Sequence, residues 1–385
     1  MRSFVSSNAT PPSNRSNRSI AMKSIKPFLF AISAIFGLIV AGCDTVGNEN
    51  EDAPAAGVFV VNQGNFGDAN GSVSVYDPVA QHTRTAAISN LGSILQSATL
   101  VGDRLYLMAN TGERIDIFDV ETLEQTGQIT DVISPRYMVT RGQKGYVTNL
   151  YGAAGIFSGG NVTVIDLEQN QKLKEIEVGN NPEGLAIVGD RLYVANFGFG
   201  EDSTVSVIDL NSEEVIDTLD ADCDGPRFLL PDKDDEIFVF CTGRTIFDEN
   251  FEPIGETDGA VRVLKASTGE ILLRIDIEGR IGSEGPGQDA FYSQDRGLIY
   301  VVKNQDSILV FDTNRNDLVD EIGPFDGDPI GAVAYDAELE RLYLGRVAGF
   351  VASGAVTIHA DDGTEIDRFT AGIAPVHIMF SATDD

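Results

Sequence analysis

The chain repeats one pattern of apolar and polar positions seven times. Each repeat starts with a short apolar run led by an aromatic residue, continues through a Gly-rich stretch, and adds a second run of alternating apolar and polar residues. The leading aromatics are Phe59, Tyr106, Tyr146, Tyr193, Phe238, Tyr300 and Tyr343, at successive spacings of 47, 40, 47, 45, 62 and 43 residues. Self-similarity at this period is typical of repeat architectures.

The alternating runs predict β-strands, because their apolar positions recur with a period of two and β-branched residues are frequent. They cover residues 71–77, 114–119, 161–166, 204–209, 260–265, 307–312 and 355–360. Most of them end at an Asp that precedes turn-forming residues, as in Asp209-Leu210-Asn211-Ser212. We predict that these carboxylates accept hydrogen bonds from backbone N–H groups in hairpin turns.

Two further strands complete each repeat. A more polar segment follows each turn, as expected of an outer edge strand, and an inner strand opens the next repeat after Pro, Gly or Ser. The inner strands are predicted over residues 135–139, 182–188, 226–230, 287–293 and 330–336. Four antiparallel strands per unit, repeated around an axis, predict an all-β fold, a seven-bladed β-propeller.

The first repeat lacks an inner strand, since the domain opens directly at Val58–Val61. The segment 375–381 has inner-strand character but no partners of its own. We predict that this C-terminal strand completes the first blade, which leaves no free sheet edge between the first and last blades.

The motifs Tyr146-Val147-Thr148-Asn149 and Tyr193-Val194-Ala195-Asn196 resemble those of the YVTN-repeat family of seven-bladed propellers. The resemblance covers about residues 57 to 381 and implies the same fold, whereas propellers host many unrelated functions. Cys241 and Arg346 stand where the family usually has Asn.

The N-terminal segment has a different character. A basic stretch from Met22, an apolar stretch from Pro27 to Val40 and the small residues before Cys43 predict a signal peptide over residues 1–42. By resemblance to bacterial lipoproteins, Cys43 becomes the lipidated N-terminus and residues 43–56 an acidic tether. Residues 1–21 are polar, so Met22 is an alternative start, and the propeller spans residues 57–385.

This anchor places the protein in the cell envelope as a membrane-attached lipoprotein. We favour the outer membrane with the propeller facing outward, and a periplasm-facing orientation is the alternative. The formal net charge is −32, and the first 42 residues carry five basic and no acidic side chains, so their removal leaves −37. Such a charge excludes nucleic acid as a partner. We expect a monomer.

Two cysteines remain after Cys43. Cys223 precedes the inner strand of the fifth repeat and Cys241 ends its second strand. The envelope permits disulfides, so we predict a Cys223–Cys241 bond beside the longest insertion. A metal site is the weaker alternative, since no further ligands stand at suitable spacing.

The sequence offers no catalytic constellation, metal site or cofactor motif. His82 falls in or before an outer strand and His359 in a strand position that other blades fill with Ile or Phe, whereas His377 lies on the closing strand near the central channel. Asp312-Thr313-Asn314-Arg315-Asn316 imitates a calcium loop, but Asp317 and Gly323 stand where Gly and a bidentate acid are required.

Long connections between the second and third strands combine Gly with aromatics and share one face with the starts of the inner strands. We predict a ligand-binding face there, because aromatic walls with a few directed polar groups suit a small molecule. Its candidate residues are Asn65, Phe66, Arg136, Tyr151, Phe157, Glu183, Phe197, Phe199, Arg227, Arg244, Gln288, Arg346, Phe350 and His377.

The favoured function is non-catalytic binding of a small molecule, such as a corrinoid or another nutrient, or of an envelope protein. Similar surface propeller lipoproteins pass such nutrients to outer-membrane transporters, which implies a transporter as partner. The alternatives are a propeller enzyme of the lactonase or lyase kind and a surface scaffold or adhesion module.

Overall fold

The computed structural model describes residues 57–152, 159–283, 285 and 287–381. The proposed signal peptide, Cys43, the tether and Phe157 lie outside these residues. Within them, no helix has both the length and the apolar character needed to cross a membrane.

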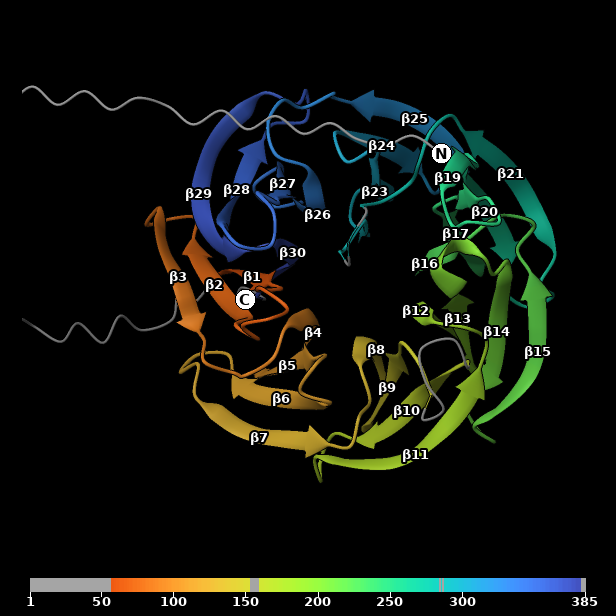
Figure 1. Ribbon diagram of the computed structural model, residues 1–385, viewed down its shortest axis with the longest axis horizontal. Helices are drawn as coiled ribbons and strands as arrows, with labels where there is room; N and C mark the ends of the chain where they lie inside the picture. Colours follow the sequence, from red (N-terminus) through yellow and green to blue (C-terminus); the bar gives the residue numbers. More distant parts are fainter. Residues whose placement is uncertain (1–56, 153–158, 284, 286, 382–385) are drawn as a thin grey trace, which may run out of the picture. The chain divides into compact units, whose positions relative to one another are not determined.

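Seven four-stranded antiparallel sheets surround a central channel (Figure 1), so the predicted seven-bladed propeller is confirmed. The inner strands, from blade 2 to blade 7, are β4 (Leu95–Val101), β8 (Pro135–Arg141), β12 (Pro182–Val188), β16 (Pro226–Pro231), β22 (Ala290–Ser293) and β26 (Ile330–Asp336). The second strands, from blade 1, are β1 (Val58–Asn62), β5 (Arg104–Ala109), β9 (Lys144–Asn149), β13 (Arg191–Asn196), β17 (Glu236–Cys241), β23 (Leu298–Lys303) and β27 (Arg341–Arg346).

The third strands, in the same order, are β2 (Ser72–Asp77), β6 (Arg114–Asp119), β10 (Gly160–Asp166), β14 (Thr204–Asp209), β20 (Gly259–Lys265), β24 (Ser307–Asp312) and β28 (Ser353–His359). The outer strands are β3 (His82–Ile88), β7 (Gln125–Thr130), β11 (Gln171–Val178), β15 (Glu214–Asp220), β21 (Ile271–Ile277), β25 (Asp317–Ile322) and β29 (Glu365–Ile373). The insertion in blade 5 adds the hairpin of β18 (Thr245–Phe247) and β19 (Pro253–Glu256).

The C-terminal strand β30 (Pro375–Phe380) is the inner strand of blade 1. It pairs antiparallel with β1, with Val60 opposite Ile378 and Val61 opposite His377. The ring is therefore closed by strands from the two ends of the propeller, as the unpaired first repeat predicts.

The apolar core lies between neighbouring blades. Each buried cluster combines side chains of two adjacent sheets, as between blades 4 and 5, where Tyr193 and Val205 pack with Leu229 and Val239. All seven leading aromatics are at most 3% exposed. Burial on this scale is the main stabilising contribution in a fold of this kind.

The Asn residue that ends several second strands forms hydrogen bonds that link its blade to the preceding blade. The Asn196 amide donates to Ser206 Oγ at 3.0 Å and accepts the Gly179 N–H at 3.1 Å, just after the outer strand of the preceding blade. Asn62 likewise donates to Ser74 Oγ and accepts the Gly372 N–H, both at 2.9 Å. The repeated Asn therefore has a structural role.

The predicted hairpin function of the strand-ending Asp residues is confirmed. Asp209 Oδ1 accepts the N–H groups of Asn211 at 3.0 Å and Ser212 at 2.7 Å. Asp312 Oδ1 accepts those of Asn314 at 2.9 Å and Arg315 at 3.1 Å. Asp312 thus stabilises a hairpin turn.

Candidate functional site

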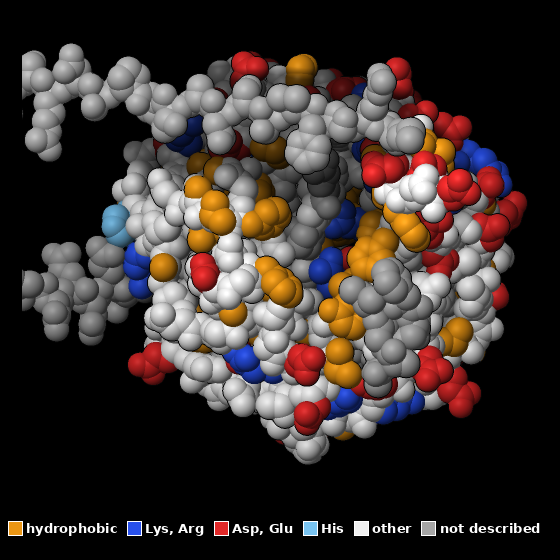
Figure 2. Space-filling view, viewed as in Figure 1, with side chains coloured by type: hydrophobic (Ala, Val, Ile, Leu, Met, Phe, Trp, Pro, Cys, Tyr) orange, Lys and Arg blue, Asp and Glu red, His pale blue; other side chains and the backbone are white. Residues whose placement is uncertain are grey.

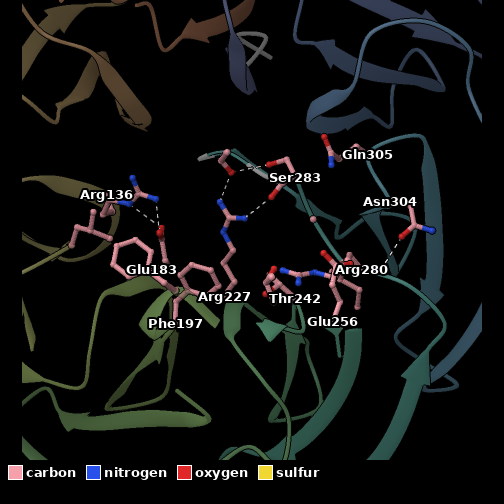
Figure 3. Close-up of a pocket in the computed structure, with 16 residues that line it drawn as sticks. Arg136, Glu183, Phe197, Arg227, Thr242, Glu256, Arg280, Ser283, Asn304 and Gln305 are labelled. Atoms are coloured by element: carbon pink, nitrogen blue, oxygen red, sulfur yellow. Dashed lines mark hydrogen bonds and ion pairs between the residues drawn. The ribbon is translucent and has the colours of Figure 1, made fainter. Parts of the chain in front are cut away.

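A cavity of about 520 Å³ opens beside the central channel. Its wall comes from the starts of three inner strands and from the long connections of blades 3 to 6. We call it the arginine cavity; Figure 3 shows its lining, which is Arg136, Leu150, Glu183, Phe197, Phe199, Arg227, Thr242, Thr245, Glu256, Arg280, Ile281, Gly282, Ser283, Gly285, Asn304 and Gln305. Figure 2 shows basic side chains within a depression of this face, with hydrophobic side chains on either side.

Arg136 and Glu183 join two blades across this wall. Arg136 Nε donates to Glu183 Oε2 at 3.0 Å, its Nη2 donates to the other carboxylate oxygen, and its Nη1 donates to Gln96 Oε1 at 2.5 Å. Arg136 is 8% exposed and Glu183 1%. A bidentate pair fixes the orientation of both groups. The Arg136 guanidinium is therefore already bound by Glu183 and Gln96.

Arg227 is held from three sides. Its Nη1 and Nη2 donate to the carbonyls of Ser283 at 3.0 Å and Gly285 at 2.6 Å. Its guanidinium carbon lies 5.4 Å from the centre of the Phe197 ring, and Nη1 lies 3.1 Å from Asp289 Oδ2. The buried cation is thereby paired and stacked, as burial of a charge requires.

Asp289 is fully buried, and the Arg227 guanidinium lies 3.1 Å from its carboxylate. Burial raises the pKa of its carboxyl from 3.8 to about 6, and Arg227 opposes this shift only in part. Burial also raises the pKa of the nearby Tyr137 hydroxyl, which donates to the Gly287 carbonyl at 2.9 Å. Desolvation is therefore the largest influence on the pKa of both Asp289 and Tyr137.

Arg280, unlike Arg136 and Arg227, forms no ion pair with the residues that the structure describes. Its backbone N–H donates to Asn304 Oδ1 at 2.8 Å, and its side chain lines the cavity (Figure 3). Its Nη1 is buried and donates to none of the described residues. Since a buried donor without a partner costs free energy, such a group calls for an explanation.

The lining also has a charge balance opposite to that of the protein. Three arginines and two glutamates line the cavity, whereas the whole chain has a formal charge of −32. Two of these arginines are neutralised by their own partners, Glu183 and Asp289. The lining charges that these two pairs leave over are those of Arg280 and Glu256.

The structure brings five predicted residues into the arginine cavity: Arg136, Glu183, Phe197, Phe199 and Arg227. The prediction that inner-strand starts and long connections share one face is thus confirmed. The same set shows that Arg136 and Glu183, predicted separately, form one ion pair.

Several other predicted residues make contacts elsewhere on this face. Asn65 Nδ2 donates to the Phe350 carbonyl at 2.8 Å, and Arg244 forms an ion pair with Glu201 at 2.9 Å. Gln288 Oε1 accepts the Ile378 N–H at 3.0 Å, which ties the closing strand to blade 6.

The remaining predicted residues also lie outside the lining of the arginine cavity. Arg346 donates to the Asp326 carbonyl at 2.5 Å, Phe66 is 74% exposed and Tyr151 is half-buried. His377 is half-buried on β30, and burial lowers its pKa to about 4, so it is neutral at pH 7.

His359 packs inside blade 7, at the strand position that other blades fill with Ile or Phe. Its ring nitrogens lie 2.9 Å from the Gly363 carbonyl and from Thr357 Oγ1. Among the described residues, no group of three or more His, Cys, Asp or Glu side chains is arranged to hold a metal ion.

Sequence reasoning missed Arg280, Asn304 and Gln305. Arg280 lies in the connection from an outer strand to the next inner strand, whereas the predicted ligand-binding face uses connections from second to third strands and the starts of inner strands. The signal in the sequence is the pair of glycines around Arg280 in Gly279-Arg280-Ile281-Gly282. In the structure these glycines have φ of +90° and +92°, a backbone conformation that L side chains rarely adopt.

Solved structures similar to this chain confirm the fold. Hydrazine synthase of Kuenenia stuttgartiensis is 19% identical with a TM-score of 0.58, and the match covers 74% of this chain and 88% of that one. The Pseudomonas aeruginosa periplasmic gluconolactonase PpgL is 14% identical with a TM-score of 0.62, covering 86% and 100%. A functionally unknown protein from Desulfotomaculum acetoxidans is 12% identical with a TM-score of 0.63, covering 85% and 99%.

These identities support the architecture and no activity. No curated protein sequence matches the chain. Residues 56–250, half of the chain, match the family described as a domain of unknown function, DUF5074. The chain therefore belongs to the DUF5074 family.

Proposed function

We propose that this propeller is a non-catalytic binding protein that holds a small anionic molecule in the arginine cavity. The observation that carries the proposal is Arg280, whose buried Nη1 donates to none of the described residues while its side chain lines the cavity. A carboxylate or phosphate would supply the missing acceptor in a charge-assisted hydrogen bond.

The other walls suit such a ligand. Phe197 and Phe199 supply aromatic surface, and Asn304 and Gln305 supply amide groups. A volume of about 520 Å³ is within the range of small-molecule sites. A whole corrinoid is too large to be enclosed in this cavity, so a smaller nutrient or metabolite fits better.

Two features favour binding over catalysis. The buried carboxylates of the site are already engaged, Glu183 with Arg136 and Asp289 with Arg227, so neither is poised as a general base. His377, the histidine predicted nearest the channel, is not part of the cavity lining.

A thermal-shift screen of carboxylic acids, sugar acids and phosphates, each paired with its neutral amide or alcohol, tests the proposal. Acids should raise the melting temperature, whereas their neutral partners should not. Arg280→Met should abolish the response. Arg274→Met is the matched control, because Arg274 is exposed on the outer strand and pairs with Asp222 at 2.7 Å.

An unchanged response in Arg280→Met would contradict the proposed site. Turnover of sugar lactones that is lost in Arg227→Met would favour the lactonase alternative. Absence of any ligand response in the screen would favour a scaffold or adhesion role.

The proposal includes an envelope location, with Cys43 as lipid anchor, and transfer of the ligand to an outer-membrane transporter. It rests on the sequence around Cys43 and on the acidic surface. Labelled palmitate should enter the protein, and Cys43→Ala should prevent labelling and release the protein from the membrane fraction. Labelling of the Cys43→Ala variant would contradict the anchor.

A further inference from the structure

A second cavity lies beside the first on the same face. It has a volume of about 330 Å³, and most of its side chains are apolar: Pro329, Ile330, Val347, Ala348, Phe350 and Val376. We call it the apolar cavity. It is built by loops of blades 5 to 7 and by the starts of the inner strands of blades 7 and 1.

The two cavities share a wall. Ser283, Gly285 and Gln305 line both of them. A Cβ built on Gly285 would lie 3.5 Å from Phe350 Cζ, so the aromatic ring of blade 7 reaches this wall. One molecule that spans the wall would therefore contact both cavities.

The register of the inner strands explains the contrast between the two cavities. Ile378 pairs with Val60, Val333 with Leu344 and Met138 with Val147, one residue after the leading aromatic in each second strand. Two residues before these inner-strand positions stand Val376, Gly331 and Arg136. This equivalent inner-strand position therefore carries a charged side chain in blades 3 to 5. In blades 7 and 1 it is occupied by Gly331 and Val376, which carry no charge.

We propose that the ligand is an anionic amphiphile, with its carboxylate on Arg280 and its hydrocarbon part in the apolar cavity. This inference rests on the proposed anion binding and extends it to a chemical class. A wholly polar anion would leave the apolar walls unfilled, and a neutral hydrocarbon would leave Arg280 without an acceptor.

Asp328 restricts the charge of the ligand further. It is exposed and lies at the lining of the apolar cavity. A second anionic group at the far end of the ligand would meet this carboxylate and be repelled. The site therefore favours one charged end and one uncharged end over a dicarboxylate.

The test is a calorimetric titration of the full chain with butanoate, hexanoate and octanoate, each below its micelle concentration. Affinity should rise roughly threefold to fourfold for each methylene that enters the apolar cavity. In Val347→Ser and Phe350→Ser the gain with chain length should shrink, so octanoate should lose more affinity than butanoate. Arg280→Met should weaken all three acids, and hexanedioate should bind less tightly than hexanoate.

The two claims fail separately. A flat dependence on chain length with retained dependence on Arg280 would overturn the amphiphile and leave the anion site. A chain-length gain that ignores Arg280→Met would overturn the anion site instead. If none of the acids binds, both are overturned; thermal unfolding of each variant checks that it is folded.

Discussion

The Arg227 guanidinium lies 3.1 Å from the Asp289 carboxylate, and both side chains are excluded from solvent, with exposures of 4% and 0%. They come from the inner-strand starts of adjacent blades, and Arg227 lines the arginine cavity. The pair thus connects the stability of the ring to the electrostatics of the proposed site.

This pair predicts a specific pH dependence of stability. The pKa of Asp289 is about 6 when folded and 3.8 ordinarily, so the folded state binds more protons between these values. The contribution of Asp289 to stability is therefore present below pH 4 and is lost as pH rises to about 6, by about 3 kcal/mol.

Asp289→Asn removes this titration. The free energy of unfolding of the wild type minus that of Asp289→Asn should fall between pH 4 and 6 and stay level above pH 7, in urea denaturation at each pH. A difference that rises over this interval would show that Arg227 outweighs burial and lowers the pKa.

A second prediction concerns the inter-blade pair of Arg136 and Glu183. Glu183→Gln leaves the Arg136 charge buried without its anion and should cost about 3 kcal/mol. The double variant with Arg136→Met should lose at least about 1 kcal/mol less than the sum of the single changes, because the interaction is removed only once. Additive losses in urea denaturation would contradict a coupled pair.

A third prediction concerns the contact between Asn196 and Gly179, which links blades 4 and 3. A Cβ at Gly179 would lie 2.3 Å from Asn196 Cγ, so Gly179→Ala should force the two blades apart and cost about 2 kcal/mol. Gly255→Ala is the control, since its Cβ would have no neighbour closer than 3.9 Å, and it should change stability by less than about 0.5 kcal/mol. Equal melting temperatures for the two variants would contradict the tight contact.

A fourth prediction concerns the bond between Cys223 and Cys241, which are 18 residues apart. Closing a loop of this length stabilises the fold by about 3 kcal/mol in the chain-entropy account. The double variant Cys223→Ala/Cys241→Ala should lose about this amount and become insensitive to reductant. A wild type that shows the same stability with and without reductant would refute the contribution.

Much of the architecture was predictable because the repeat is visible in single residues. The leading aromatics mark the second strands, and the unpaired first repeat required the segment after Pro375 to close the ring. The cysteines could be paired since both fall at the same end of one blade. The Asn of the motifs that resemble YVTN-repeat propellers has a structural role, as the hydrogen bonds of Asn196 show. The family to which the chain belongs is DUF5074.

The site was predictable only in part. The positions of Arg136, Glu183 and Arg227 at the starts of their inner strands place all three at one end of the central channel. They do not reveal which carboxylate each arginine pairs with. Arg280 escaped prediction because its position depends on the path of an irregular connection. The apolar cavity depends on how loops of blades 5 to 7 and the closing strand meet, which no local pattern encodes.

The most direct test of the account is the affinity of hexanoate measured by calorimetry for the wild type, Arg280→Met and Arg274→Met at low ionic strength. The account predicts equal affinities for the wild type and Arg274→Met, at least a tenfold weaker affinity for Arg280→Met, and no binding of hexanamide by any of them. Equal hexanoate affinities in all three proteins, or equal binding of hexanamide, would contradict it.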